Sequence, residues 1–89
     1  MSEQFAPVEF HCVVEASPGA LSRVLEPLAK RDLVPDTVRA TREGATLRVS
    51  LTVLRMPVEM IHLVEGNIGQ IFGVLRQETT LLAQRRAAA

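Results

Sequence analysis

The segment 15–25 joins an alternating apolar run to a helical pattern, and its beginning carries the residues best suited to bind a ligand. Ser17 is a favourable N-cap residue, and Pro18 fits the first helical position because proline lacks the N–H group that would be unpaired there. Gly19 has no Cβ atom, so an anion such as a carboxylate can approach the backbone N–H groups of residues 19–21. The same pattern also describes a helix start that is capped and binds nothing, which is the commoner use of such residues.

Residues that could hold a metal ion or act as a nucleophile do not cluster in the sequence. His11 and Cys12 are neighbours in an expected strand, where consecutive side chains point to opposite faces. His62 lies about 100° from the apolar stripe of its expected helix. No Ser or Cys stands in a motif that pairs it with a base. We therefore expect no metal site, no cofactor, no catalytic residue and no enzyme activity of the chain's own.

The charges of the chain balance, with ten Lys and Arg residues against ten Asp and Glu residues. A basic stripe could be formed by Arg39, Arg42, Arg48 and Arg55, although such a set is more often a solvated face. Three Phe residues and no Trp or Tyr give little surface for stacking bases, so we expect no nucleic-acid partner.

The length of 89 residues predicts one domain with a modest core, which a partner subunit would help to stabilise. No apolar run approaches the roughly 18 residues that span a bilayer, and the N-terminus lacks the pattern of a signal peptide. The single cysteine, Cys12, argues against a secreted domain held by disulfides. We expect a cytoplasmic protein without a membrane partner.

The first half of the chain predicts a strand, a helix and a hairpin. The strand begins at Pro7, and the helix that follows ends near residues 30–32. The segment 37–42 is expected to be an edge strand because Pro35, which precedes it, cannot donate a ladder hydrogen bond. A turn at 42–45 then leads into the clearest alternation of the chain. The expected inward residues are Val8, Phe10, Cys12 and Val14; Leu21, Val24, Leu25 and Leu28; Val38 and Ala40; and Leu47, Val49, Leu51 and Val53.

The second half predicts a helix that begins at Pro57 and ends before Gly69, followed by a last strand at 71–77. The last strand is apolar on both faces, which indicates a covered edge or a subunit contact. The apolar stripe of the helix consists of Met60, Ile61, Val64 and Ile68. We expect residues 1–7 to be a flexible N-terminus, residues 8–78 to form the domain and residues 79–89 to be a tail.

The order strand, helix, strand, strand, helix, strand consists of two similar halves. Short right-handed connections then favour an α+β fold of the ferredoxin-like kind, a four-stranded antiparallel sheet with both helices on one face. Some RNA-recognition modules share this strand order, so a small RNA-binding domain is an alternative. The lack of an outward aromatic pair on the expected central strands speaks against it.

The run Gly19-Ala20-Leu21-Ser22-Arg23-Val24, with an Arg-containing hairpin and a second helix at Pro57, resembles the ACT domain. It is most similar to the short small regulatory subunit of acetolactate (acetohydroxyacid) synthase. The resemblance implies a homodimer formed through sheet edges. It also implies a subunit that binds and activates the thiamine-diphosphate-dependent catalytic subunit in branched-chain amino-acid biosynthesis. Many relatives sense valine at a dimer interface made by the loop before the first helix and the segment after it.

The resemblance also implies a set of ligand-binding residues. Valine-responsive relatives carry an Asn at two positions of this set, and here those positions are Ala16 and Val34. Backbone N–H groups could still hold a carboxylate, but no obvious group would hold the ammonium of an amino acid. We therefore expect activation of a partner rather than feedback sensing, with a stand-alone amino-acid sensor dimer as the alternative. The implied site residues are Ala16, Ser17, Pro18, Gly19, Ala20, Leu21 and Val34.

Overall fold

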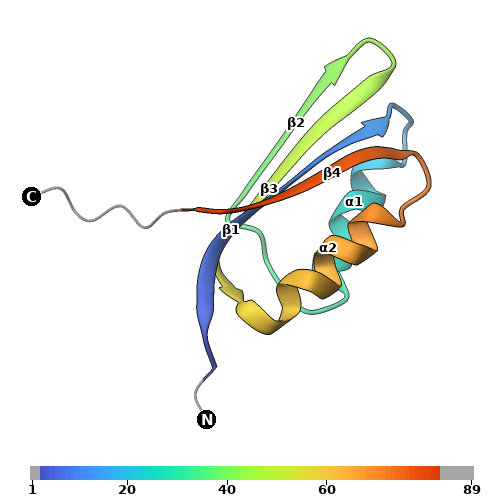
Figure 1. Cartoon of the computed structure of the whole chain (residues 1–89). Coiled ribbons are helices and arrows are strands. Elements are labelled where there is room, and N and C mark those ends of the chain that lie inside the picture. The colour runs from blue at the N-terminus through green and yellow to red at the C-terminus, as the bar shows by residue number, and fades with distance from the viewer. Residues whose placement is uncertain (1–2, 83–89) are drawn as a thin grey trace, which may run out of the picture.

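A computed structural model describes residues 3–82 of the chain. The strands and helices follow the predicted order, and β2-β3-β1-β4 form one sheet in which all neighbours are antiparallel. Both helices lie on one side of this sheet (Figure 1). The predicted ferredoxin-like α+β fold is therefore confirmed. The elements are β1 (Phe5–Glu15), α1 (Ala20–Ala29), β2 (Thr37–Glu43), β3 (Thr46–Pro57), the 3-10 helix η1 (Val58–Met60), α2 (Ile61–Gly69) and β4 (Val74–Leu81).

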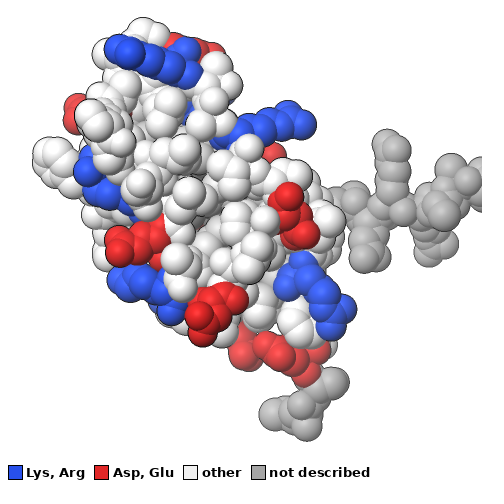
Figure 2. Space-filling view, turned by 180° about the vertical axis from the view of Figure 1, so that it is seen from behind, with Lys and Arg blue, Asp and Glu red and all other residues white. Residues whose placement is uncertain are grey.

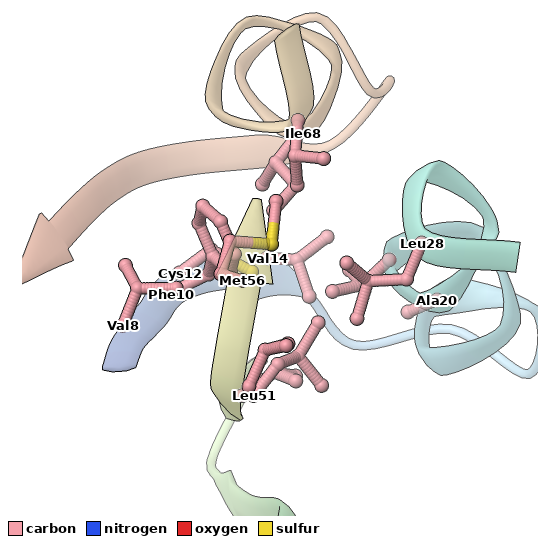
Figure 3. Close-up of a cluster of buried hydrophobic side chains, with 13 residues drawn as sticks. Val8, Phe10, Cys12, Val14, Ala20, Leu28, Leu51, Met56 and Ile68 are labelled. Carbon is pink, nitrogen blue, oxygen red and sulfur yellow. The ribbon is translucent and has the colours of Figure 1, made fainter. Parts of the chain in front are cut away.

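The central strand β1 supplies the middle of the core through strict alternation. Val8, Phe10, Cys12 and Val14 are all buried, as predicted. They meet buried residues of β3 and of both helices (Figure 3). The cluster closes with Ala20, Val24 and Leu28 of α1, Val49, Leu51, Val53 and Met56 of β3, and Val64 and Ile68 of α2.

The edge strand β2 differs from the prediction. Val38 and Ala40 were expected to point into the core, but every residue of β2 is exposed. The reason is the reach of the helical layer, because the β2–β3 hairpin extends beyond the helices (Figure 1). Its position at the edge of the sheet, expected from Pro35, is confirmed.

The two helices start later than predicted. α1 begins at Ala20 and continues through Pro27 to Ala29, with Leu33 N–H donating to Leu28 O at 2.9 Å beyond its end. α2 begins at Ile61, because Pro57 still belongs to β3 and residues 58–60 form η1. Gly69 is the last helical residue instead of the first one outside.

The last strand is displaced toward the C-terminus. β4 begins at Val74, so Ile71 and Phe72 lie in the turn before it, and Phe72 is 84% exposed. Val74 packs against the core, whereas Leu75 is exposed. The sheet also begins at Phe5 and continues to Leu81, beyond both ends of the expected domain 8–78. The remainder of the expected tail, residues 83–89, and residues 1–2 of the expected flexible N-terminus lie outside the described residues.

Candidate ligand site at the start of the first helix

The loop between β1 and α1 is held by backbone hydrogen bonds to two other turns. Glu15 N–H donates to Gly73 O, in the turn before β4, at 2.9 Å. Ala16 N–H donates to Ala45 O, in the β2–β3 turn, also at 2.9 Å. Three turns therefore meet at this end of the sheet, and they fix the position of the residues that follow.

The start of α1 is built differently from the prediction. Ser17 was expected to cap the helix, but Gly19 is the N-cap residue and no side chain makes a capping bond. Ala20 N–H instead donates to Ser17 O at 3.1 Å, which closes a turn before the helix. Pro18 occupies the second position of this turn, a position that its fixed φ angle suits.

Arg23 reaches back from the first turn of α1 over the corner. Its Nη2 donates to Ser17 Oγ at 3.0 Å. A Cβ atom on Gly19 would lie only 2.9 Å from Arg23 Nη1, so the absence of a side chain at Gly19 lets the guanidinium lie against the backbone. A positive group at the positive end of a helix is unfavourable unless an anion is close.

A hollow of about 440 Å³ lies beside this corner. The loop supplies Ala16, Ser17 and Pro18 to its wall, and the hairpin supplies Arg42 and Leu47. Within residues 3–82, neither Arg23 nor Arg42 pairs with a carboxylate. The hollow therefore has the positive charge of Arg42 in its wall, and Arg23 lies outside the wall on the other side of Ser17, so the surroundings favour a carboxylate group.

Backbone donors add to this preference. Among the described residues, the N–H groups of Gly19, Leu21 and Ser22 find no protein acceptor, as expected for the first turn of a helix. Ala20 is fully buried behind them. The corner thus offers backbone N–H groups with the Arg23 guanidinium beside them, and Arg42, whose Nε donates to Gly44 O at 2.9 Å, adds positive charge from the hairpin.

The structure brings together most of the residues that the sequence predicted for a site, but not all. Ala16, Ser17 and Pro18 line one hollow, and residues 19–21 adjoin it. Val34 is 81% exposed and lies beyond the opposite end of α1, a helix about 15 Å long. The sequence missed Arg23 and Arg42 as site residues. For Arg23, the only indication in the sequence was its position six residues after Ser17. For Arg42, it was the hairpin register, which places this residue opposite Leu47.

A second group with possible chemistry lies on the face of the sheet that carries no helix, called here the open face. His11 Nδ1 and Ser50 Oγ lie 2.8 Å apart, because β1 and β3 place these residues opposite each other. The N–H groups of paired strands lie in the plane of the sheet and serve its ladder, so they are not aimed at an oxyanion beside Ser50. This contact is a cross-strand hydrogen bond without the surroundings of a catalytic dyad.

Two further results concern metal ions and membranes. Among residues 3–82, no three His, Cys, Asp or Glu side chains gather closely enough to hold a metal ion. No helix in the described part of the chain has the length and apolar character needed to cross a bilayer.

Cys12 is a core residue, and its thiol is expected to be unreactive in the folded protein. Burial raises the pKa of this thiol, so little thiolate forms. We expect a thiol reagent to label Cys12 at least about a hundredfold more slowly in buffer than in concentrated urea, because labelling needs an opening of the fold. Equal rates in the two solutions would contradict the packing described here.

The raised pKa of Cys12 also sets the sign of a pH effect. The protonated thiol favours the folded state, so this contribution is complete below the ordinary thiol pKa and is lost as the pH rises through the folded value. Urea unfolding measures the free energy of unfolding of the parent and of Cys12→Ala at increasing alkaline pH. We expect this free energy to fall less with pH in the variant than in the parent.

Comparisons with known proteins agree with the fold. The model of a family described as ACT-like domain matches residues 1–86. No curated protein sequence matches the chain. A solved uncharacterized protein of Thermotoga maritima is 23% identical, with a TM-score of 0.72 over 89% of this chain and 99% of its own.

Two other solved structures are similar at lower identity. The ACT domain of GTP pyrophosphokinase from Chlorobium tepidum, determined in solution, has a TM-score of 0.74 at 12% identity over 94% of this chain and 96% of its own. The C-terminal domain of the MgtC protein from Mycobacterium tuberculosis has a TM-score of 0.69 at 11% identity over 98% of each chain. At these identities the solved structures show a shared fold.

Proposed function

This chain belongs to the ACT-like domain family of small-molecule regulatory modules, and we propose on this premise that it is a non-catalytic regulatory subunit. Its partner in the proposal is the catalytic subunit of a thiamine-diphosphate-dependent acetolactate synthase in the cytoplasm, which it binds and activates. The resemblance of the run from Gly19 to Val24 supports this choice of enzyme. The cofactor belongs to the partner, and the chain itself carries none in this proposal.

The observation that carries the proposal is an exposed surface formed by β2 and α1. β2 pairs with β3 alone, and its other edge has no neighbour among residues 3–82. Val38, on this strand, is 42% exposed, and Leu21 and Leu25 of α1 and Leu47 of β3 are only partly buried. Figure 2 shows the molecule from behind, with uncharged atoms across the middle and charged side chains toward the rim. Such a surface is typical of a subunit contact.

A second copy of the chain fits this surface. Two β2 strands can pair edge to edge, and the two α1 helices would then cover the apolar side of the hairpins that each chain leaves exposed. A two-fold arrangement of this kind could also bring Val34 of one copy toward the corner of the other, which a single chain does not achieve. The proposed ligand site is therefore completed by dimerisation.

Activation of an enzyme is tested by mixing the chain with the catalytic subunit. Size-exclusion chromatography should show co-elution, and acetolactate formation should rise with added chain until it saturates. A mixture that neither co-elutes nor gains activity would exclude this partner.

The alternative of a stand-alone amino-acid sensor has its own observation, the anion-attracting corner beside Gly19. Calorimetry of the chain alone with branched-chain and other amino acids separates the two functions. Heat and a raised melting temperature without a catalytic subunit would favour the sensor. Absence of both at millimolar concentrations would remove it.

Arg23 provides a specific prediction for any carboxylate ligand. We expect Arg23→Ala to weaken binding about 10- to 100-fold, the loss of one charge-assisted hydrogen bond of roughly 1.5–3 kcal/mol. Arg55→Ala, which removes an exposed arginine near the end of β3 far from the corner, is the matched control and should leave the affinity unchanged. Calorimetric titration of both variants gives the comparison, and an equal loss in both would contradict a role for the corner.

A further inference from the structure

The open face of the sheet holds a shallow hollow that the proposed ligand site does not use. Its volume is about 390 Å³. Because Cys12 and Val14 point into the core, Val13 between them points to the open face. The hollow is lined by Val13, Glu43, Thr46, Arg48, Leu75 and Arg76.

The floor of the hollow is apolar because of an irregularity in β4. Val13 pairs with Arg76 and Val14 pairs with Val74, which leaves Leu75 as the extra residue of a β-bulge. A bulge redirects side chains, and Leu75 is 60% exposed beside the half-buried Val13. Two apolar side chains thus adjoin where the neighbouring β1 residues of this face are His11 and Glu15.

Two guanidinium groups flank this floor. Arg48 of β3 and Arg76 of β4 are the partners of Val13 on its two sides, so their Cα atoms lie roughly 10 Å apart, two strand spacings. Arg48 contacts Glu43 at 3.5 Å, but both side chains are about half exposed and such a pair is readily exchanged. Arg76 pairs with no carboxylate in the described part of the chain.

The shape of the hollow distinguishes between possible occupants. Small-molecule sites enclose most of their ligand, whereas a hollow on an open sheet covers one side of it. A protein surface could cover the other side and exclude water from the ionic contacts. The arrangement suits an acidic side chain between the arginines and an apolar side chain against Val13 and Leu75.

We propose that this hollow docks a segment of the catalytic partner that carries an Asp or Glu next to a large apolar residue. The inference rests on the proposed function, and it names the surface through which activation would occur. It places partner binding on the open face and ligand binding on the corner beside the helices.

The test compares two charge-reversed variants with the parent chain. Arg48→Glu with Arg76→Glu changes the hollow, and Lys30→Glu with Arg55→Glu makes the same change of charge elsewhere. Each is titrated against the acetolactate synthase catalytic subunit, with activity and co-elution as readouts. We expect the hollow variant to need at least about 30-fold more protein for half-maximal activation, and the control to stay within about threefold.

A variant with neutral residues at the same two positions keeps the test usable if charge reversal prevents folding. If circular dichroism shows that the charge-reversed hollow variant is unfolded, Arg48→Gln with Arg76→Gln is measured instead, with at least a fivefold loss expected. Leu75→Ser should lower the affinity as well, because it removes half of the apolar floor.

The outcomes separate this inference from the function on which it rests. Parent and hollow variant that activate equally would overturn the docking surface and leave the regulatory function standing. A parent that neither binds nor activates would overturn both. A hollow variant that loses self-association but keeps activation would show that a second copy occupies the hollow, which also overturns the inference.

Discussion

Replacing Phe10 by alanine is expected to lower the free energy of unfolding by about 3–5 kcal/mol. Phe10 lies in the central strand β1, is 1% exposed and belongs to the cluster that joins the sheet to both helices (Figure 3). Its truncation removes a large buried surface and leaves a cavity that a close-packed core fills only in part. Since small domains are stable by roughly 5–15 kcal/mol, much of the variant should be unfolded at moderate temperature.

Phe72→Ala is the matched control, because it deletes the same side chain from an exposed position. Phe72 is 84% exposed in the turn before β4, so its loss should change the stability by less than about 0.5 kcal/mol. Urea unfolding followed by circular dichroism gives both values. A loss below about 1 kcal/mol for Phe10→Ala would contradict the central place of this residue in the core.

The second large effect is expected on self-association. Lysines in place of Val38 and Ala40 should raise the dissociation constant of the dimer at least about a hundredfold, equal to roughly 2.7 kcal/mol. Both side chains lie on the face of β2 that adjoins the core side of β3 and are left exposed by a single chain. Charged residues at such positions prevent edge-to-edge pairing because the charges would be buried in the contact.

The control places the same charges on the other face of the same strand. Thr37→Lys with Thr41→Lys should leave the dimer nearly intact, since these side chains point to the open face. Sedimentation over a range of protein concentrations measures both constants. A parent chain that is monomeric at high micromolar concentration would exclude the proposed pairing.

The alternation of residues predicted the strands well where one face is covered by helices. β1 has all of its expected buried residues, and β3 has Val49, Leu51 and Val53, because their apolar face lies under α1 and α2, while Leu47 at the start of β3 is only partly buried. β2 has the same alternation but no helix above it, so Val38 and Ala40 are exposed. A pattern in the sequence shows which side of a strand is apolar, but the length and position of the helices decide whether anything covers it.

The candidate site was only partly predictable for a related reason. Residues 16–21 are contiguous, so their proximity follows from the chain itself. Arg42 reaches the same hollow only through the hairpin register, and the Arg23 side chain could have extended into solvent. The helix start was misplaced because Ser17 and Pro18 suit a turn as well as a cap, and backbone bonds from Glu15 and Ala16 to neighbouring turns favour the turn.

The two outer strands of the sheet are unlike each other. β2 follows β3 from Thr37 to Glu43 without a register shift, whereas β4 has a bulge at Leu75 and is regular only from Arg76 onward. A bulge twists an edge strand and hinders the addition of another strand there, whereas a fully regular edge accepts one more readily. If only the edge of β2 readily accepts another strand, a chain can pair with one other copy, and the resulting dimer has no such edge exposed. Growth should therefore stop at closed pairs, so concentrated solutions of this chain should remain clear instead of forming fibres.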